Sequence, residues 1–162
     1  MKSSEGKSFI ATLHSTTPGI EGKIGISVPL TEFDFAVSGW LQVTTRGERS
    51  VPVSLRFDYL AQAEDRILYN IFCESKAGGY QGAKLGVSRN GYLGLYQRAE
   101  VESYWKVEPI GEDWERSNER HFILRTATGR RVKNYQYDNR DDYLNYDAGV
   151  PLTFLAKVKK TF

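Results

Sequence analysis

Lys23-Ile24-Gly25-Ile26-Ser27 returns further along the chain as Lys84-Leu85-Gly86-Val87-Ser88, with only aliphatic exchanges between the two copies. Downstream of each copy, Gly39-Trp40-Leu41-Gln42-Val43 returns as Gly91-Tyr92-Leu93-Gly94-Leu95, and Asp142-Tyr143-Leu144-Asn145-Tyr146 is a weaker third copy. The copies lie 52 residues apart (91 − 39) and 51 residues apart (142 − 91), close to one third of the 162 residues. An internal repeat of this length indicates three similar structural units.

Each unit divides into four short apolar segments that are separated by turn residues. The expected segments are 8–13, 23–27, 40–44 and 51–57 in the first unit, 69–74, 84–88, 92–96 and 104–108 in the second, and 121–126, 131–135, 143–146 and 154–158 in the third. Val53, Leu55 and Phe57 alternate with polar residues, a period of two that indicates strands. Asn90-Gly91 predicts a hairpin turn, because these residues supply the positive φ values of a tight turn. The nearest approach to a helix, 60–68, is expected to form one turn at most.

Twelve short strands in three groups of four predict an all-β fold, in which six strands close a barrel and three hairpins cap one end. The chain resembles the β-trefoil superfamily over residues 8–162, in the order of Lys-Ile-Gly-Ile, a turn, Gly-aromatic-Leu and a closing strand. Gly91-Tyr92-Leu93 is similar in style to lectin-like and fascin-like trefoils. The Gln-x-Trp signature of ricin-type trefoils is missing from the closing strands, which puts a ricin-style galactose site in doubt. We predict one domain over 1–162, with repeats at about 8–58, 69–110 and 121–162.

Composition limits the classes of partner. The formal net charge of +2 implies neither nucleic acid nor an anionic membrane surface. Cys73 is the single cysteine, so no intrachain disulfide can form, and its position in an apolar strand predicts a buried, inert thiol. The first residues lack the apolar core of a signal peptide and no apolar run could span a membrane, so we expect no membrane insertion. A cytoplasmic protein fits, or one released without a classical signal peptide.

Catalytic chemistry finds little support in the residues. The chain has two histidines, His14 and His121, at corresponding strand ends, and no spacing typical of metal ligands. A glycosidase would need two carboxylates across a cleft, which consecutive acids on one turn do not provide. We therefore expect no enzymatic activity, no metal and no cofactor.

The best candidate for a ligand site is the acidic segment 138–142 in the third unit. Tyrosines flank it on both sides, at 135, 137, 143 and 146. Flat ring faces beside carboxylate and amide oxygens are what a sugar requires, so we predict a glycan or glycoprotein ligand. The alternative is that the tyrosines only pack the cap. The predicted ligand-binding residues are Tyr135, Tyr137, Asp138, Asn139, Asp141 and Tyr146, with Asn90 and Tyr96 at the analogous place in the second unit.

Two functions follow from this reading. The first is a non-enzymatic, lectin-like trefoil that binds carbohydrate. The alternative is a protein-binding trefoil, such as a protease inhibitor or a cytoskeletal or toxin-partner module. Such a protein would present an exposed loop. The two candidate loops are 16–20 and the first-unit insertion 29–38, which contains Glu32-Phe33-Asp34-Phe35.

Overall fold

A computed structural model describes residues 7–27, 39–44, 50–76, 79–97, 104–111, 114–137 and 141–162 of the chain. Fourteen β-strands and no α-helix are assigned within these ranges. Six of them pair in a closed ring, each with the next and the last with the first. In ring order these strands are β1 (Phe9–Ser15), β14 (Phe154–Thr161), β10 (Glu119–Thr126), β9 (Trp105–Pro109), β6 (Arg66–Cys73) and β5 (Ser54–Ala63).

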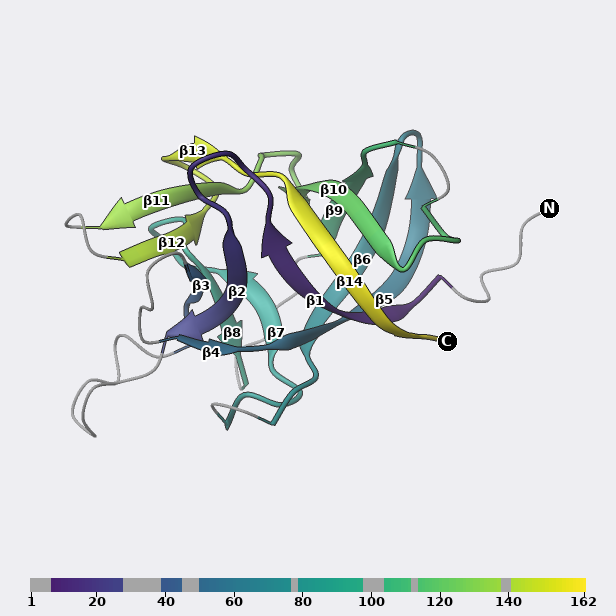
Figure 1. Ribbon diagram of the computed structural model, residues 1–162, viewed down its shortest axis with the longest axis horizontal. Coiled ribbons are helices and arrows are strands. Elements are labelled where there is room, and N and C mark those ends of the chain that lie inside the picture. Colours follow the sequence, from purple (N-terminus) through teal and green to yellow (C-terminus); the bar gives the residue numbers. More distant parts are fainter. Residues whose placement is uncertain are drawn as a thin grey trace.

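Three hairpins lie at one end of this barrel, one from each unit of the sequence. They are β2 (Gly22–Ser27) with β3 (Leu41–Thr44), β7 (Lys84–Val87) with β8 (Leu93–Tyr96), and β11 (Lys133–Tyr137) with β12 (Asp141–Asn145). Figure 1 shows β11–β12 and β3 toward the left end, and β2 beside β1, with which it pairs. A closed six-stranded barrel with three capping hairpins is a β-trefoil, and the predicted fold is confirmed.

The hairpins are joined in a cycle that the repeat explains. Each unit has an aromatic residue at the same place in this phrase: Trp40, Tyr92 and Tyr143. Each of them pairs with a residue of another unit, two positions after the aromatic residue of that unit. The antiparallel pairs are Trp40 with Gly94, Tyr92 with Asn145, and Tyr143 with Gln42. Because each unit supplies one partner and accepts one, the three copies close the cap together.

The repeated serine joins the two repeated phrases. The Ser27 hydroxyl accepts a hydrogen bond from the backbone N–H of Trp40 at 3.1 Å, and Ser88 accepts one from Tyr92 at 3.2 Å. Gly39 and Gly91 both have positive φ values, 84° and 86°. Asn90 is not among the described residues with positive φ, so the turn prediction holds for the glycine but is wrong for the asparagine.

The barrel interior is filled by alternate residues of each strand. In β6, Ile67, Tyr69, Ile71 and Cys73 are buried while their neighbours are only partly covered. Buried phenylalanines stack in pairs, Phe9 with Phe57 at 4.6 Å and Phe122 with Phe154 at 5.6 Å between ring centroids.

Trp114 and Arg120 pack on this aromatic layer. The Trp114 ring packs edge-on against Phe9 and Phe122, and the Arg120 guanidinium lies 4.6 Å from the centroid of Phe9.

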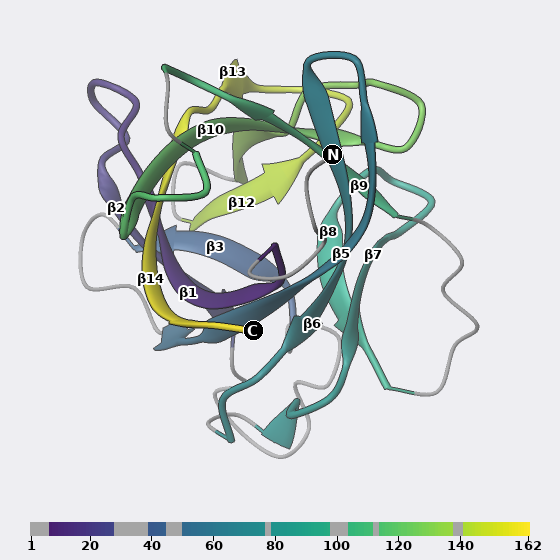
Figure 2. The ribbon, with the colours of Figure 1, turned by 90° about the vertical axis from the view of Figure 1, so that its right-hand side faces the viewer.

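Several boundaries differ from expectation. The predicted strand 51–57 divides into β4 (Ser50–Pro52) and β5, and β5 continues to Ala63 as one arm of a long hairpin with β6. The region 60–68 therefore forms strands and a turn instead of a helical turn, because its residues extend the barrel pairing. The hairpin turn stands at the top edge of the molecule in Figure 2. A further short strand, β13 (Val150–Pro151), pairs with β11. The described part of the chain contains no helix long and apolar enough to cross a membrane.

Candidate functional site

The structure distributes the predicted ligand residues over different places. Tyr135 is 37% exposed and lines a pocket beside β11, whereas Tyr146 lines a second pocket. Asn90 lies in the β7–β8 turn, where its carbonyl accepts a hydrogen bond from the Asn145 side chain at 3.1 Å. Tyr96 ends β8, and burial raises the pKa of its hydroxyl.

The acidic part of the predicted glycan site is only partly described. The backbones of Tyr137 and Asp141 pair at the turn end of β11 and β12. The structure describes these two residues by their backbone alone. Asp138 and Asn139 lie outside the described residues, as does the insertion 29–38. The roles proposed for these residues stay predictions.

Tyr135 combines the two roles that the sequence left open. Its ring packs edge-on against Tyr92 at 6.2 Å between centroids, and Tyr92 also meets Tyr143 and Trp40. The four rings thus form part of the cap packing. Because Tyr135 is still more than a third exposed, its ring also remains accessible to a ligand.

A pocket of about 540 Å³ lies beside Tyr135, and we call it the Asn134 pocket. Its polar floor contains Asn134 and Asp142, which are 5% and 6% exposed. The Asn134 side-chain amide donates a hydrogen bond to Asp142 Oδ1 at 3.0 Å, and Asn134 Oδ1 is buried without a hydrogen-bond partner. The complete lining is Gly19, Ile20, Glu21, Asn134, Tyr135, Gln136, Asp142, Gly149 and Val150.

A buried polar atom without a partner is costly, so an unsatisfied Asn134 oxygen beside a pocket suits a ligand that donates a hydrogen bond. Gln136 and Glu21 add exposed amide and carboxylate groups at the rim. The sequence did not identify Asn134, because an asparagine inside a predicted strand carries no local sign of burial.

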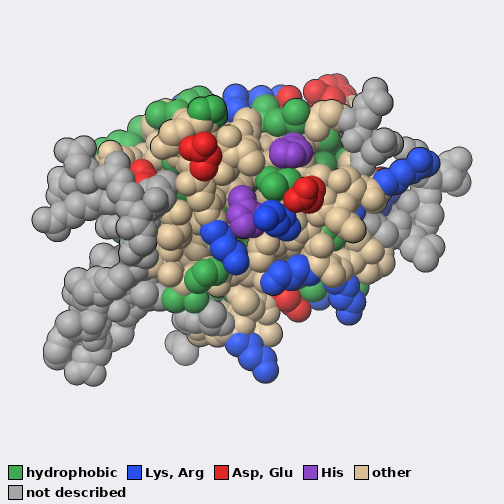
Figure 3. All heavy atoms as spheres, in the orientation of Figure 1, with side chains coloured by type: hydrophobic (Ala, Val, Ile, Leu, Met, Phe, Trp, Pro, Cys, Tyr) green, Lys and Arg blue, Asp and Glu red, His purple; other side chains and the backbone are tan. Residues whose placement is uncertain are grey.

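The two histidines flank one strand of the barrel. His14 of β1 and His121 of β10 both lie opposite Leu155 of β14, and Figure 3 shows both imidazoles on the same face of the molecule. Burial lowers the pKa of His14, and the positive charges of Lys157 and Lys23 lower it further. Among the described residues, no three His, Cys, Asp or Glu side chains are grouped so that they could hold a metal ion.

Cys73 has the environment predicted for it. The side chain is 1% exposed, and burial raises the pKa of its thiol. The thiolate, which is the reactive form of cysteine, is therefore disfavoured.

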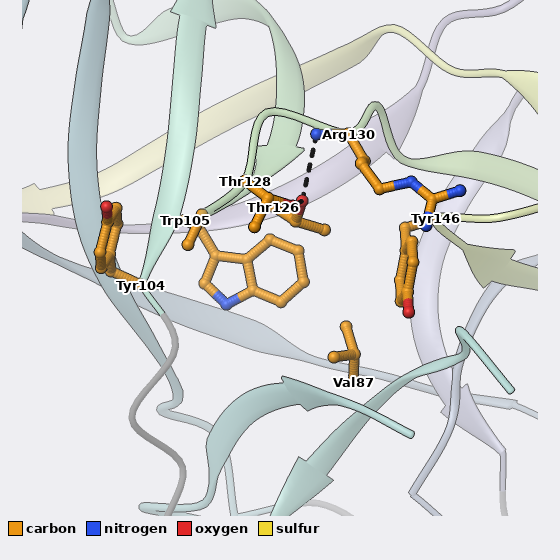
Figure 4. Close-up of a pocket in the computed structure, with 8 residues that line it drawn as sticks. Val87, Tyr104, Trp105, Thr126, Thr128, Arg130 and Tyr146 are labelled. Carbon is orange, nitrogen blue, oxygen red and sulfur yellow. Dashed lines mark hydrogen bonds between the residues drawn. The ribbon is translucent and has the colours of Figure 1, made fainter. Parts of the chain in front are cut away.

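A second pocket, of about 230 Å³, lies where the second and third units meet, and we call it the Trp105 pocket. The six-membered ring of Trp105 points toward Tyr146, with Val87 on one side of the gap and Arg130 on the other (Figure 4). The Trp105 indole N–H donates to the carbonyl of Leu85 at 3.1 Å, which fixes the ring. The complete lining is Val87, Tyr104, Trp105, Thr126, Ala127, Thr128, Arg130 and Tyr146.

The polar rim of the Trp105 pocket is made by the loop between β10 and β11. Thr126 Oγ1 accepts a hydrogen bond from the backbone N–H of Arg130 at 3.1 Å and lies 3.1 Å from Thr128 Oγ1. The Arg130 guanidinium lies 4.7 Å from the centroid of the Tyr146 ring and contacts Asp147 Oδ1 at 2.8 Å. Sequence reasoning found only Tyr146 here, because the lining comes from segments far apart in the chain.

The β5–β6 hairpin offers a third kind of surface. A bulge between Tyr59 and Ala61 leaves Leu60 out of the pairing, and Leu60 is 46% exposed. At the tip, the Gln62 side-chain amide donates to the carbonyls of Glu64 and Arg66 at 3.0 and 3.2 Å, which holds the turn.

One edge of this hairpin is open within the described structure. β1 pairs with β5 only as far as Phe57, and the Tyr59 N–H donates to the Ser8 hydroxyl at 2.9 Å. No described strand pairs with the outer edge of β5 beyond these residues. An open edge presents unpaired backbone groups to a partner chain.

The loop 16–20, one of two loops considered for inhibition, is a tight turn. The Ile20 N–H donates to the Thr17 carbonyl at 2.9 Å, and Gly19 has a φ of 84°. The Thr16 N–H donates to the Thr153 carbonyl, and the Thr153 N–H donates to the Thr17 hydroxyl. The tip therefore consists of a closed Pro-Gly turn and offers no extended segment to a partner.

Comparisons with known proteins agree with the fold. The sequence matches no protein-family model and no curated protein. Among solved structures, the chain is similar to the double-headed arrowhead protease inhibitor A, crystallised in complex with two trypsins. The TM-score is 0.61 with 12% sequence identity, and the match covers 94% of this chain and 90% of the inhibitor chain. A likeness at this identity shows a shared β-trefoil fold.

Proposed function

We propose that this chain is a non-enzymatic, protein-binding β-trefoil that inhibits a protease through its β5–β6 hairpin. The observation that carries the proposal is the exposed Leu60 on a bulge next to an open strand edge. An open edge gives backbone hydrogen bonds to an added strand, and an exposed apolar side chain gives specificity by filling a pocket. The similar inhibitor, which was crystallised with two trypsins, supports a protease as the first partner class to test.

The hairpin chemistry favours one kind of protease. Leucine suits the apolar specificity pocket of a chymotrypsin-like enzyme, whereas the trypsin pocket contains an aspartate and prefers a basic side chain. The hairpin carries two basic residues, but the Arg56 guanidinium lies 2.6 Å from Asp58 and the Arg66 guanidinium lies 3.7 Å from Glu108. We therefore expect inhibition of chymotrypsin-like enzymes to exceed inhibition of trypsin.

The test is titration of chymotrypsin-like, elastase-like and trypsin-like proteases with the full chain, with residual activity as the measurement. Leu60→Asp should abolish inhibition of the preferred enzyme. Ile110→Asp is the matched control, because Ile110 is also 46% exposed but lies after β9. The proposal fails if no protease is inhibited, or if both variants inhibit as well as the wild type.

Carbohydrate binding is a second candidate function, and the Asn134 pocket is the observation that favours it. Exposed Tyr135 supplies a ring for stacking, and the unpartnered Asn134 oxygen supplies an acceptor for a hydroxyl. A glycan array should then show bound sugars for the wild type and none for Tyr135→Ala. Tyr104→Ala, which alters the other pocket, should retain them. Absence of glycan binding by the wild type would remove this candidate and leave the inhibitor proposal untouched.

A further inference from the structure

The Trp105 pocket has the size and lining of a site for one aromatic ring. Its volume is about 230 Å³, and apolar cavities of roughly 150 Å³ are known to bind benzene. Trp105 is 1% exposed and belongs to the core behind the pocket, whereas the half-buried Val87 and Tyr146 side chains form its accessible apolar walls (Figure 4). A flat ring in this pocket would gain an aromatic contact with Tyr146 and apolar contacts with Val87.

The rim adds a cation that is held in place but weakly paired. Arg130 stacks on Tyr146, which orients the guanidinium at the mouth of the pocket. Its partner Asp147 is exposed, with side-chain exposures of 50% for Arg130 and 66% for Asp147. An exposed ion pair of this kind contributes about 0–1 kcal/mol. A ligand carboxylate could replace Asp147 at little cost and form a two-pronged contact with the guanidinium.

We propose that the Trp105 pocket binds a small aromatic monocarboxylate. The ring lies between Val87 and Tyr146, and the carboxylate lies on Arg130 with the Thr128 hydroxyl beside it. This inference is independent of the protease partner, because none of the pocket residues belongs to the β5–β6 hairpin.

The test is a titration of the full chain with phenylacetate and with its neutral analogue phenylacetamide, followed by NMR. Both probes should shift the Val87 methyl and Trp105 indole signals. Phenylacetate should bind up to about fivefold more tightly, because an ion pair with a half-exposed guanidinium contributes up to about 1 kcal/mol. Arg130→Gln should remove that difference, whereas Arg116→Gln, at an exposed arginine outside the pocket, should preserve it.

Two further variants separate binding from folding. Asp147→Asn removes the competing carboxylate, so phenylacetate should bind up to about fivefold more tightly while phenylacetamide is unchanged. Tyr146→Ala should weaken both probes, because it removes one wall. The backbone spectrum of each variant reports whether it is folded. The proposal is overturned if the wild type shows no shifts at Val87 and Trp105, or if acid and amide bind equally well.

Discussion

The hydroxyl of Ser88 accepts a hydrogen bond from the backbone N–H of Tyr92 across the β7–β8 turn. Ser27 makes the same contact with Trp40, although nine more residues separate the two phrases in the first unit (39 − 23 = 16 against 91 − 84 = 7). The repeat therefore preserves how these two hairpins close and leaves the length between the phrases free to vary.

Removal of either hydroxyl should destabilise its own hairpin. Ser27→Ala and Ser88→Ala should each lower the free energy of unfolding by about 1 kcal/mol, as expected for one hydrogen bond. The double variant should depart from the sum of the two losses, because the donor residues Trp40 and Tyr92 pack against each other. Urea denaturation measures both effects, and Ser88→Thr, which keeps the hydroxyl, is the control. A Thr variant as weak as the Ala variant would contradict this explanation.

Asn145 should be more sensitive than either serine. It is 3% exposed, donates to the Asn90 carbonyl at 3.1 Å and accepts from the N–H groups of Asp147 and Ala148 at 2.6 and 3.0 Å. Asn145→Ala removes all three contacts and should cost about 2–3 kcal/mol.

Asn145→Asp provides the matched comparison. The carboxylate keeps the two accepted bonds but turns its second oxygen toward the Asn90 carbonyl. Protonation of that oxygen restores a donor, so this variant should lose less stability than the wild type as the pH falls from 7 to 4. Equal losses would show that the Asn90 contact contributes nothing.

The fold was readable from sequence because its determinants are local and recur: both phrases occur twice in full, and the second has a weaker third copy at 142–146. The Lys-Ile-Gly-Ile-Ser and Gly-aromatic-Leu phrases specify strands, a turn glycine and the serine that closes the turn. The bulge at Leu60 has no such signal, because it depends on how β5 continues beyond Phe57, which pairs with Phe9, the first residue of β1.

The pockets were less readable for a related reason. The Trp105 pocket joins residues near 87, 105, 128 and 146, which become neighbours only when the units pack together. Tyr135 and Tyr146 were both selected from sequence as ligand residues of one site, but they line separate pockets. The local composition identified tyrosines that suit a ligand, but it did not show that Tyr135 and Tyr146 line different pockets.

Gly149 should tolerate a side chain less well than Gly19, although both have positive φ, 119° and 84°. A methyl group at Gly149 would overlap the Asn134 carbonyl oxygen, whereas one at Gly19 would meet nothing within 4 Å. Gly19→Ala should cost about 1–2 kcal/mol from backbone strain alone. Gly149→Ala should cost about 1–3 kcal/mol more from overpacking. Thermal unfolding compares the stability of the two variants. Equal losses would show that the β11 backbone at Asn134 moves to accommodate the added methyl group.

His14 should make stability depend on pH. Because its pKa in the folded protein lies below the ordinary value of 6.5, the unfolded chain takes up a proton first as the pH falls. Its contribution to stability is therefore complete above pH 6.5 and is lost as the pH falls toward the lower folded value. His14→Gln should show a smaller loss of stability over this range than the wild type.

Lys157→Gln tests the cause of that shift. Lys157 and Lys23 lower the His14 pKa while Glu119 raises it, with burial as the largest effect. Removal of the Lys157 charge should move the His14 pKa upward, as followed by its imidazole NMR signals. An unchanged titration would exclude a contribution from this lysine.

Arg120 should respond in opposite directions to two substitutions. It is 2% exposed and donates to the carbonyls of Ser117 and Glu115 at 2.8 and 3.2 Å, but its Nη1 is buried without a partner. Its guanidinium also lies over the rings of Phe9 and Trp114, 4.6 and 5.5 Å from their centroids. Burial lowers the pKa of this guanidinium, which indicates that the charge is poorly solvated in the folded protein. The residue therefore combines favourable packing with an unfavourable desolvated charge.

Arg120→Met keeps most of the packing volume and removes the desolvated charge, so its free energy of unfolding should equal or exceed that of the wild type. Arg120→Ala removes both and opens a cavity against Phe9 and Trp114, so it should lose about 2–4 kcal/mol. Denaturant unfolding of the two variants separates packing from charge. A Met variant as unstable as the Ala variant would mean that the bonds to Ser117 and Glu115 outweigh the cost of burying the guanidinium, and that the charge itself holds the turn over the end of the barrel.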